Sequence, residues 1–219
     1  MRRHAITLAM LSLLAAALPV VGCASGATSS TSADATAPPL VTRTLRFETP
    51  ADLDAWVIHG GEWKVEDGHA VGRSLYPATE RYSWLTYRTF YGEIRRVVVH
   101  AALDGGSPHN LRIGVGAMTI VLNWEGGDMN LVHYRGSDAC VVRPRALVPG
   151  REYEIVLEQI EGRLRLVVGD HLLWEDEGRL AGTVTVYPAL GSTIRVRDVT
   201  ITGRAVPWVD VDFPSLPHF

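Results

Sequence analysis

From Leu40 onward, apolar and polar residues alternate with a period of two, and no segment carries an apolar stripe at the helical spacing of 3.6 residues. Turn-forming residues interrupt this alternation at intervals of about eight to twelve residues, a spacing typical of sandwiches and barrels. Such short strands must pair into sheets that bury one face each. The sequence therefore predicts an all-β fold, a two-sheet antiparallel β-sandwich.

The residue pattern also predicts individual elements. The segment Gly60 to Gly72 reads as a hairpin, with Asp67-Gly68 as a type I′ turn and Trp63 on its buried face. Apolar residues change phase between Val196 and Val199, which predicts a bulge near Asp198. Residues 50–56 are expected to form one short helical turn. The other predicted strands are 41–47, 82–90, 92–103, 110–115, 118–124, 128–135, 152–160, 163–168, 172–175, 184–187 and 194–202.

The N-terminal residues are predicted to form an export signal. Arg2 and Arg3 precede an apolar stretch whose core, Leu8 to Leu18, has the length of a signal-peptide h-region and is short for a hydrocarbon core of about 30 Å. Residues 23–39 are rich in Ser, Thr, Ala and Pro and have too little apolar surface to fold, so they are expected to form a flexible tether. This predicts a signal peptide (1–22), a tether (23–39), a jelly-roll domain (40–204) and a Pro-rich tail (205–219).

The run Val20-Val21-Gly22-Cys23 resembles the bacterial lipobox. The resemblance implies that Cys23 is lipidated and becomes the first mature residue, with the domain anchored in the cell envelope outside the cytoplasm. Ala24 after the cysteine favours, by the same resemblance, an outer membrane where one exists. An ordinary signal peptide with an incidental cysteine remains the alternative. Acylation of Cys23 would leave Cys140 without a disulfide partner, so the core must stabilise the domain alone.

The charge balance excludes one class of partner. The chain has 21 basic and 24 acidic residues, and removal of residues 1–22 takes away two arginines, leaving a net charge of −5. This composition offers no electrostatic footprint for nucleic acid. Membrane contact is expected through the lipid anchor only.

A family resemblance begins at Trp56 and runs through Gly60-Gly61-Glu62-Trp63-Lys64-Val65-Glu66-Asp67-Gly68. This opening is similar to that of concanavalin A-like lectin/glucanase jelly rolls, notably the 3-keto-disaccharide hydrolase-like family. The segments 127–135 and 173–176 resemble an uncharacterised lectin-like family found beside pectin-degradation genes. Together these resemblances cover most of residues 42–203 and imply a jelly roll that binds or processes carbohydrate. The Glu-x-Asp-x-x-Glu signature of laminarinase-like glucanases is absent, so no catalytic residue is predicted.

Strand phase supplies a candidate ligand face. If Met129 and Leu131 face the core, then Asp128, Asn130 and Tyr134 face outward together. Sugars are recognised by an aromatic ring for the C–H face and by polar groups for hydroxyls. The predicted ligand-binding residues are Trp84, Arg88, Arg112, Asn123, Asp128, Asn130 and Tyr134, with Arg96 and His100 at the margin. The alternative is a solvated sheet face with Asn and Asp side chains that stabilise turns.

Two further groups of residues are candidates for a structural or cofactor-binding role. His133 shares the phase of Met129 and Leu131, which favours a half-buried structural role. Residues 125–128 have a faint calcium-loop composition, so the prediction is no cofactor, with a structural calcium ion as the alternative.

Three functions are compatible with these residues. The first is an envelope-anchored lipoprotein with a lectin-like domain that binds or processes a carbohydrate. The second is a non-catalytic structural or assembly module of the envelope. The third is a hydrolase or lyase acting on a modified disaccharide or a uronic-acid glycan.

Overall fold

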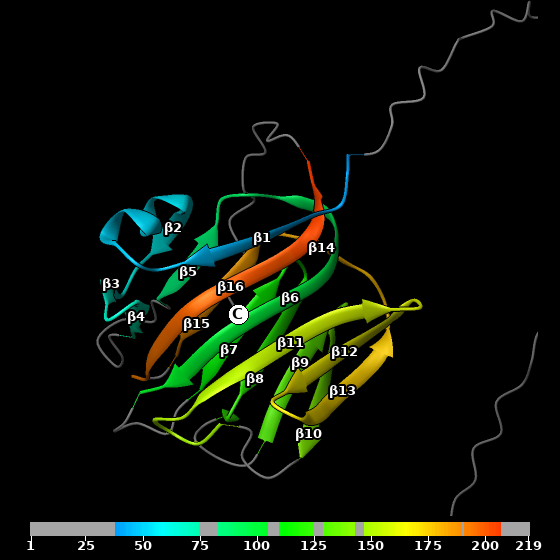
Figure 1. The fold of residues 1–219 in the computed structure, drawn as a ribbon. Coiled ribbons are helices and arrows are strands. Elements are labelled where there is room, and N and C mark those ends of the chain that lie inside the picture. Colours follow the sequence, from blue (N-terminus) through cyan, green and yellow to red (C-terminus); the bar gives the residue numbers. More distant parts are fainter. Residues whose placement is uncertain are drawn as a thin grey trace, which may run out of the picture. The chain divides into compact units, whose positions relative to one another are not determined.

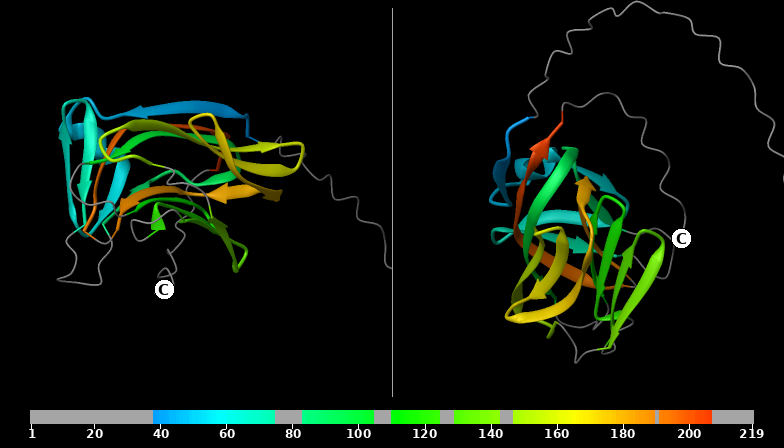
Figure 2. Two further views of the ribbon diagram at one scale, coloured as in Figure 1. Left: turned by 90° about the horizontal axis from the view of Figure 1, so that it is seen from below. Right: turned by 90° about the vertical axis from the view of Figure 1, so that its right-hand side faces the viewer.

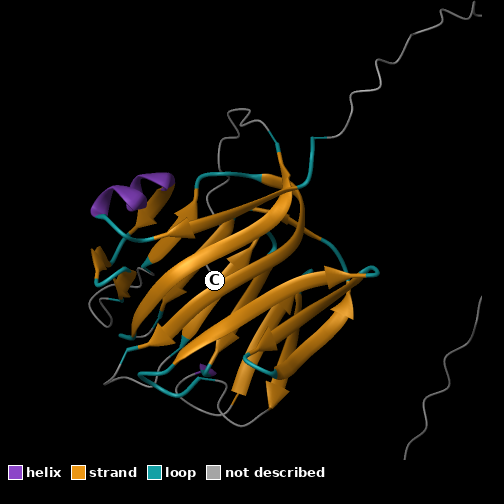
Figure 3. Cartoon of the chain, in the orientation of Figure 1, coloured by secondary structure: helices purple, strands orange, loops and turns teal. Residues whose placement is uncertain are grey.

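The computed structural model describes residues 38–74, 83–104, 110–124, 129–142, 147–189 and 191–206, without the side chains of 137–142. Strands dominate these residues, and a short 3₁₀ helix, η1 (Pro50–Ala55), lies at one edge (Figures 1 and 3). The strands form two antiparallel sheets, which face each other in the left view of Figure 2. The predicted all-β, two-sheet antiparallel sandwich is confirmed.

Sheet A is the nine-stranded sheet. Its main path runs β13 (His171–Glu177), β12 (Arg163–Val168), β11 (Glu152–Ile160), β6 (Tyr91–Leu103), β16 (Thr193–Ala205), β4 (His69–Arg73) and β3 (Glu62–Glu66). In addition, β1 (Val41–Arg46) pairs with β16, and β14 (Leu180–Gly182) pairs with β6. The long strands β6 and β16 are central, so they hold both ends of the sheet together.

Sheet B has seven strands. Its order is β10 (Ser137–Val142), β9 (Met129–Tyr134), β8 (Met118–Leu122), β7 (Leu111–Val115), β15 (Val184–Pro188), β5 (Trp84–Tyr87) and β2 (Trp56–His59). Strands that follow each other along the chain, such as β6 and β7, can therefore lie in different sheets. No helix among the residues listed above is long and apolar enough to cross a membrane.

Local sequence signals explain several elements. Asp67 and Gly68 both have positive φ, 50° and 73°, as a type I′ turn between β3 and β4 requires. The register of β16 shifts between Val196 and Asp198, which confirms the predicted bulge. The carboxylate of Asp52 accepts hydrogen bonds from the backbone N–H groups of Glu48 (2.8 Å) and Thr49 (2.6 Å), which stabilises the start of η1.

The hydrophobic core lies between the sheets and is built from the side chains of each strand that point toward the other sheet. Trp63 packs against this core as predicted, although it is only half-buried because β3 is an edge strand. Its ring lies across Gly72, where the Cβ atom of any other residue would overlap the indole. The small residue on β4 therefore makes room for the large one on β3.

The predicted signal peptide (1–22) and most of the tether fall outside the described residues, as does the tail after Val206. The described strands run from Val41 to Ala205. The last strand pairs with the first, with Gly203 opposite Val41. Arg204 also donates a hydrogen bond to the carbonyl of Pro38 (2.6 Å), so the chain enters and leaves the sandwich at the same place.

Candidate functional site

The outer face of sheet A is covered by paired charges. Arg96 on β6 lies 3.7 Å from Glu158 on β11, and Glu158 lies 3.6 Å from Arg165 on β12. Arg165 in turn contacts Glu175 on β13 at 3.2 Å. Exposed ion pairs of this kind contribute about 0–1 kcal/mol each. The Arg and Glu side chains in this series pair with one another, as is typical of a solvated sheet face.

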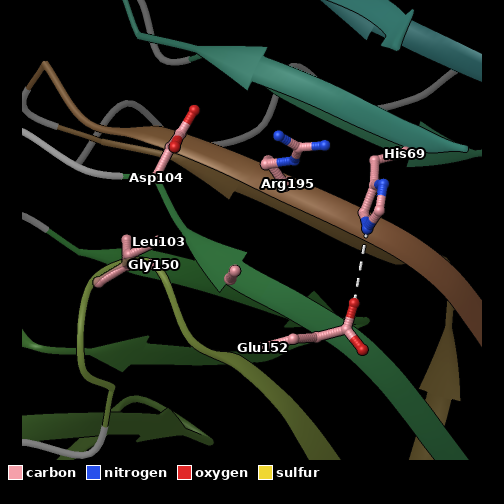
Figure 4. Close-up of a pocket in the computed structure, with 7 residues that line it drawn as sticks. His69, Leu103, Asp104, Gly150, Glu152 and Arg195 are labelled. Atoms are coloured by element: carbon pink, nitrogen blue, oxygen red, sulfur yellow. Dashed lines mark ion pairs between the residues drawn. The ribbon is translucent and has the colours of Figure 1, made fainter. Parts of the chain in front are cut away.

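A small cavity of about 210 Å³ lies on the same face (Figure 4). Small-molecule sites usually measure about 300–1,000 Å³, so this cavity is small for an oligosaccharide. One wall is closed by an ion pair between His69 and Glu152 at 3.5 Å. The full lining is His69, Ala102, Leu103, Asp104, Gly150, Glu152 and Arg195.

The outer face of sheet B is different, because aromatic side chains cross it from strand to strand. His59 on β2 meets Trp84 on β5, with ring centroids 6.3 Å apart, and Trp84 meets Tyr187 on β15 at 5.6 Å. The Arg112 guanidinium on β7 lies 5.8 Å from the Tyr187 ring and 5.7 Å from the Trp124 ring. We call these five residues the aromatic row.

The cross-strand register places a second set of outward residues beside the aromatic row. Thr86 pairs with Thr185, Thr185 with Gly114, and Gly114 with Thr119. The hydroxyl oxygens of Thr86 and Thr185 lie 3.1 Å apart. The face thus combines a line of rings with an adjoining band of small residues, several of which carry hydroxyl groups.

The aromatic row is also held firmly in place. The Arg112 Nε donates to the Asn110 side-chain oxygen at 2.8 Å, which fixes the guanidinium between two rings. Trp84, Arg112 and Tyr187 make further contacts beyond these, and Tyr187 is only 8% exposed. Rigid, partly buried rings lose little conformational entropy when a ligand stacks on them.

Two of the predicted ligand residues, Trp84 and Arg112, do lie together on this face, because both contact Tyr187. Arg88 follows β5 and takes no part in the row. Its Nε donates to the carbonyls of Asp54 (3.1 Å) and Trp56 (3.2 Å), so it ties η1 and β2 to the end of β5.

The predicted orientation of β9 is wrong. Asn130, Val132 and Tyr134 face the core and are 1%, 1% and 8% exposed, whereas Leu131 and His133 face outward. The reason is the register with β8, which sets Val132 opposite Ile120 and Tyr134 opposite Met118. Ile120 and Met118 both point into the core and are buried. Both sets of alternate residues in β9 contain apolar side chains, so the sequence pattern fits either orientation.

Asn123, Asn130 and Tyr134 therefore act inside the fold rather than on a ligand face. Asn123 Nδ2 donates to the Leu147 carbonyl (2.6 Å), and its Oδ1 accepts from the Leu147 N–H (3.0 Å). The Asn123 N–H donates to Asn130 Oδ1 (3.0 Å). The Tyr134 hydroxyl donates to the Arg179 carbonyl (3.2 Å) and accepts from the Arg179 N–H (3.1 Å).

Arg96 and His100 lie on β6, in sheet A, and their side chains face away from sheet B. They are therefore not at the margin of the aromatic row, because the sandwich separates the two outer faces. Asp128 lies outside the described residues. The nine predicted residues thus do not converge on one surface.

Three members of the row, Tyr187, His59 and Trp124, were not among the residues predicted from strand phase. A signal for Tyr187 was present, because Val184 and Val186 form the apolar set of β15 and leave Thr185 and Tyr187 on the other face. His133 is half-buried, as predicted, but it lies on the outward side of β9 together with Leu131.

Among the residues that the structure describes, no group of three or more His, Cys, Asp or Glu side chains could hold a metal ion. Residues 125–128, considered as a calcium loop, lie outside that part.

Comparisons with known proteins identify the fold. No family model and no curated protein matches this chain. Among solved structures, a Bacillus subtilis protein of unknown function with a galectin-like fold aligns with a TM-score of 0.60 at 9% identity, covering 78% of this chain and 99% of its own. The apo Crh5 transglycosylase aligns at 0.57 and 13% identity, over 76% and 88%.

The exoplasmic/lumenal domain of VIP36, in a form bound to Ca²⁺ and Man3GlcNAc, aligns with a TM-score of 0.51 at 10% identity, over 71% of this chain and 86% of that one. At these identities the likeness concerns the fold alone. The chain therefore has a jelly-roll sandwich fold, as its sequence predicted.

Proposed function

We propose that the aromatic row and its band of small residues form a carbohydrate-binding surface. The observation that carries this proposal is the unbroken contact from His59 through Trp84, Tyr187 and Arg112 to Trp124. The C–H face of a sugar ring stacks on an aromatic ring, and its hydroxyls bond to hydroxyl and planar N–H groups. Both components lie side by side on this face.

The size of the row suits a chain of sugars. Four of its members lie on the neighbouring strands β2, β5, β15 and β7 of sheet B, and Trp124 follows the end of β8. Since neighbouring strands are about 4.8 Å apart, the part of the row from β2 to β7 is about 14 Å long. The named jelly-roll neighbours, a transglycosylase and a domain bound to Man3GlcNAc, support a glycan as the class of ligand.

Binding is favoured over hydrolysis by the chemistry of the face. Glycoside hydrolysis typically uses two carboxyl groups about 5–5.5 Å or about 6.5–9.5 Å apart, whereas the row supplies rings and a guanidinium and the adjoining band supplies hydroxyls. A hydrolase or lyase acting on a modified disaccharide or uronic-acid glycan would release shorter products from a bound oligosaccharide. A purely structural envelope module would bind no glycan at all.

Replacing Trp84 with alanine is expected to weaken binding by at least about tenfold, or about 1.4 kcal/mol. The substitution removes the ring that joins His59 to Tyr187. A glycan array would first identify the oligosaccharide, and titration calorimetry would then compare the variants. Trp84→Phe should retain part of the affinity because it retains a ring.

The control for this experiment is Thr200→Ala on the outer face of sheet A, which should bind as wild type. Equal loss of affinity in both variants would show that the ligand does not lie on the row. Absence of binding in wild type across neutral and acidic glycans would contradict the proposed function.

We infer further that the protein is an exported lipoprotein anchored in the cell envelope through Cys23, with the outer membrane favoured where one exists. The lipobox-like run and the tether composition support this proposal. The tether ends where the sandwich begins, since β1 starts at Val41. Export of this kind places the ligand face outside the cytoplasm.

Cys23→Ser is expected to abolish membrane association, because the thiol is the site of acylation. Membrane fractionation and mass spectrometry of the N-terminal peptide measure the result. Cys140→Ser is the matched control and should fractionate as wild type. An unmodified N-terminal peptide in the wild-type protein would contradict the inference.

A further inference from the structure

The two outer faces of the sandwich differ in their charged side chains. On sheet A, arginines lie beside carboxylates, and five of them are within 4.0 Å of a carboxylate oxygen: Arg96, Arg163, Arg165, Arg195 and Arg197. Sheet B has six strands whose side chains the structure describes. The outward positions of these six strands hold no aspartate or glutamate.

The same face of sheet B does carry positive charge. Arg112 points outward from β7 and lies in the aromatic row. Arg88 directly follows β5, two residues after Thr86, and its Nε donates to two main-chain carbonyls. A guanidinium keeps its charge at any ordinary pH. The described part of this face is therefore positive, although acidic residues outnumber basic ones in the chain, 24 to 21.

The group that orients Arg112 is an amide. Its Nε donates to the side-chain oxygen of Asn110 at 2.8 Å, and Asn110 is fully buried. The main-chain carbonyl of Asn110 accepts a hydrogen bond from the Ser192 hydroxyl at 3.0 Å, which ties it to the segment between β15 and β16. An amide oxygen is neutral, so this hydrogen bond fixes the guanidinium without cancelling its charge.

A guanidinium oriented in this way is suited to a carboxylate. The N–H groups on its terminal nitrogens form a planar fork that can bind both oxygens of a carboxylate at once. Arg112 lies one strand from Tyr187, and neighbouring strands are about 4.8 Å apart. A sugar held by the rings beside Arg112 therefore brings its ring substituents close to the guanidinium. Hydrogen bonds between charged groups are roughly twice as strong as those between neutral groups.

We propose that the glycan bound by the aromatic row is acidic, and that Arg112 pairs with the carboxylate of one of its uronic-acid residues. This inference rests on the proposed function, because it names the class of ligand for the same surface. The outward positions of the described strands of sheet B present no carboxylate that would repel such a ligand. On the outer face of sheet A the same ligand would meet carboxylates such as Glu158 and Glu175 beside the arginines.

The test uses three matched pairs of oligosaccharides in titration calorimetry. The pairs are 1,4-linked oligomers of glucose, mannose and galactose, each with the corresponding uronic-acid oligomer, in which a carboxylate replaces the hydroxymethyl group at carbon 6. Wild type is expected to bind the acidic member of at least one pair about tenfold more tightly than the neutral member. This preference should shrink between about 0.01 M and 1 M salt, because the Debye length falls from about 30 Å to about 3 Å.

Arg112→Gln should reduce the ratio of acidic to neutral affinity to about one, because the variant removes the charge. Arg112→Lys should restore part of the preference, since it keeps the charge but not the planar fork. Arg165→Gln is the matched control. It removes the same charge from the outer face of sheet A, so it should keep the wild-type preference. The salt series needs wild type alone and does not require any variant to fold.

The outcomes separate this proposal from the proposed function. Equal affinity for both members of each pair, or binding of neutral glycans only, would overturn the acidic ligand and leave carbohydrate binding intact. A preference that survives Arg112→Gln but disappears in Arg165→Gln would place the carboxylate on sheet A and also overturn it. Binding of no glycan of either class would overturn both proposals.

Discussion

Replacing Gly116 with alanine is expected to destabilise the domain by about 4 kcal/mol, at the upper end of the range for single substitutions. Gly116 lies in the turn between β7 and β8 with φ of 55°, a region that disfavours side chains. A Cβ atom there would overlap the carbonyl oxygen of Ala181. The Gly116 N–H also donates to the Thr183 carbonyl at 2.9 Å, so the turn cannot move away without losing this bond.

Chemical denaturation of the two proteins measures this effect, and Gly162→Ala provides the matched control. Gly162 has φ of 81° in the turn between β11 and β12, but nothing lies within 4 Å of the position of its Cβ atom. The free energy of unfolding of that variant should fall only by the cost of placing a side chain in the left-handed conformation, about 1 kcal/mol. Equal losses of stability in the two variants would mean that the contact between Gly116 and Ala181 is not rigid.

The contact at Gly116 joins the two sheets at the level of the backbone. The turn belongs to sheet B, and Ala181 belongs to β14 of sheet A. Gly182 completes the contact, because its own Cβ atom would lie 2.6 Å from the Gly116 Cα. Nothing in the local sequence distinguishes Gly116 from a glycine in an open turn such as Gly162.

Much of the fold could be predicted from local pattern because local pattern causes it. Alternation of apolar and polar residues selects strands, and the Asp67-Gly68 pair selects a turn with two positive φ values. The bulge near Asp198 was visible because apolar residues change phase there. Each of these features depends only on neighbours in the chain.

The candidate site was predictable only in part, because it depends on which strands become neighbours. On β7 the apolar residues Leu111, Ile113 and Val115 point inward, so alternation alone predicts that the Arg112 side chain points outward. Strand β9 has apolar residues on both faces, so its orientation is fixed by pairing with β8. Sheet membership is equally non-local, which is why His100 and Arg112 lie on opposite faces of the sandwich.

Substitutions of the adjacent residues Asn123 and Trp124 are expected to affect different properties, stability for Asn123 and glycan binding for Trp124. Asn123→Ala should destabilise the domain by about 3 kcal/mol, since buried groups left without hydrogen bonds cost about 1–3 kcal/mol each. Leu147 is fully buried, and both its N–H and its carbonyl would lose the Asn123 side chain as partner. The affinity of the folded fraction for glycan should stay unchanged.

Trp124→Ala should reduce the affinity for glycan and leave the stability of the domain nearly unchanged. Trp124 is half-buried at the end of the aromatic row, where it stacks on Arg112, so its loss should weaken glycan binding about tenfold. The stability of this variant should remain within about 1 kcal/mol of wild type, because Trp124 is half-buried and does not belong to the core cluster formed by the described residues. Urea denaturation and calorimetry on the same two proteins decide the matter. If Asn123→Ala lost affinity at unchanged stability, the ligand face would include the turn at Asn123, as strand phase alone had predicted, and the assignment to the outward rings of sheet B would have to be revised.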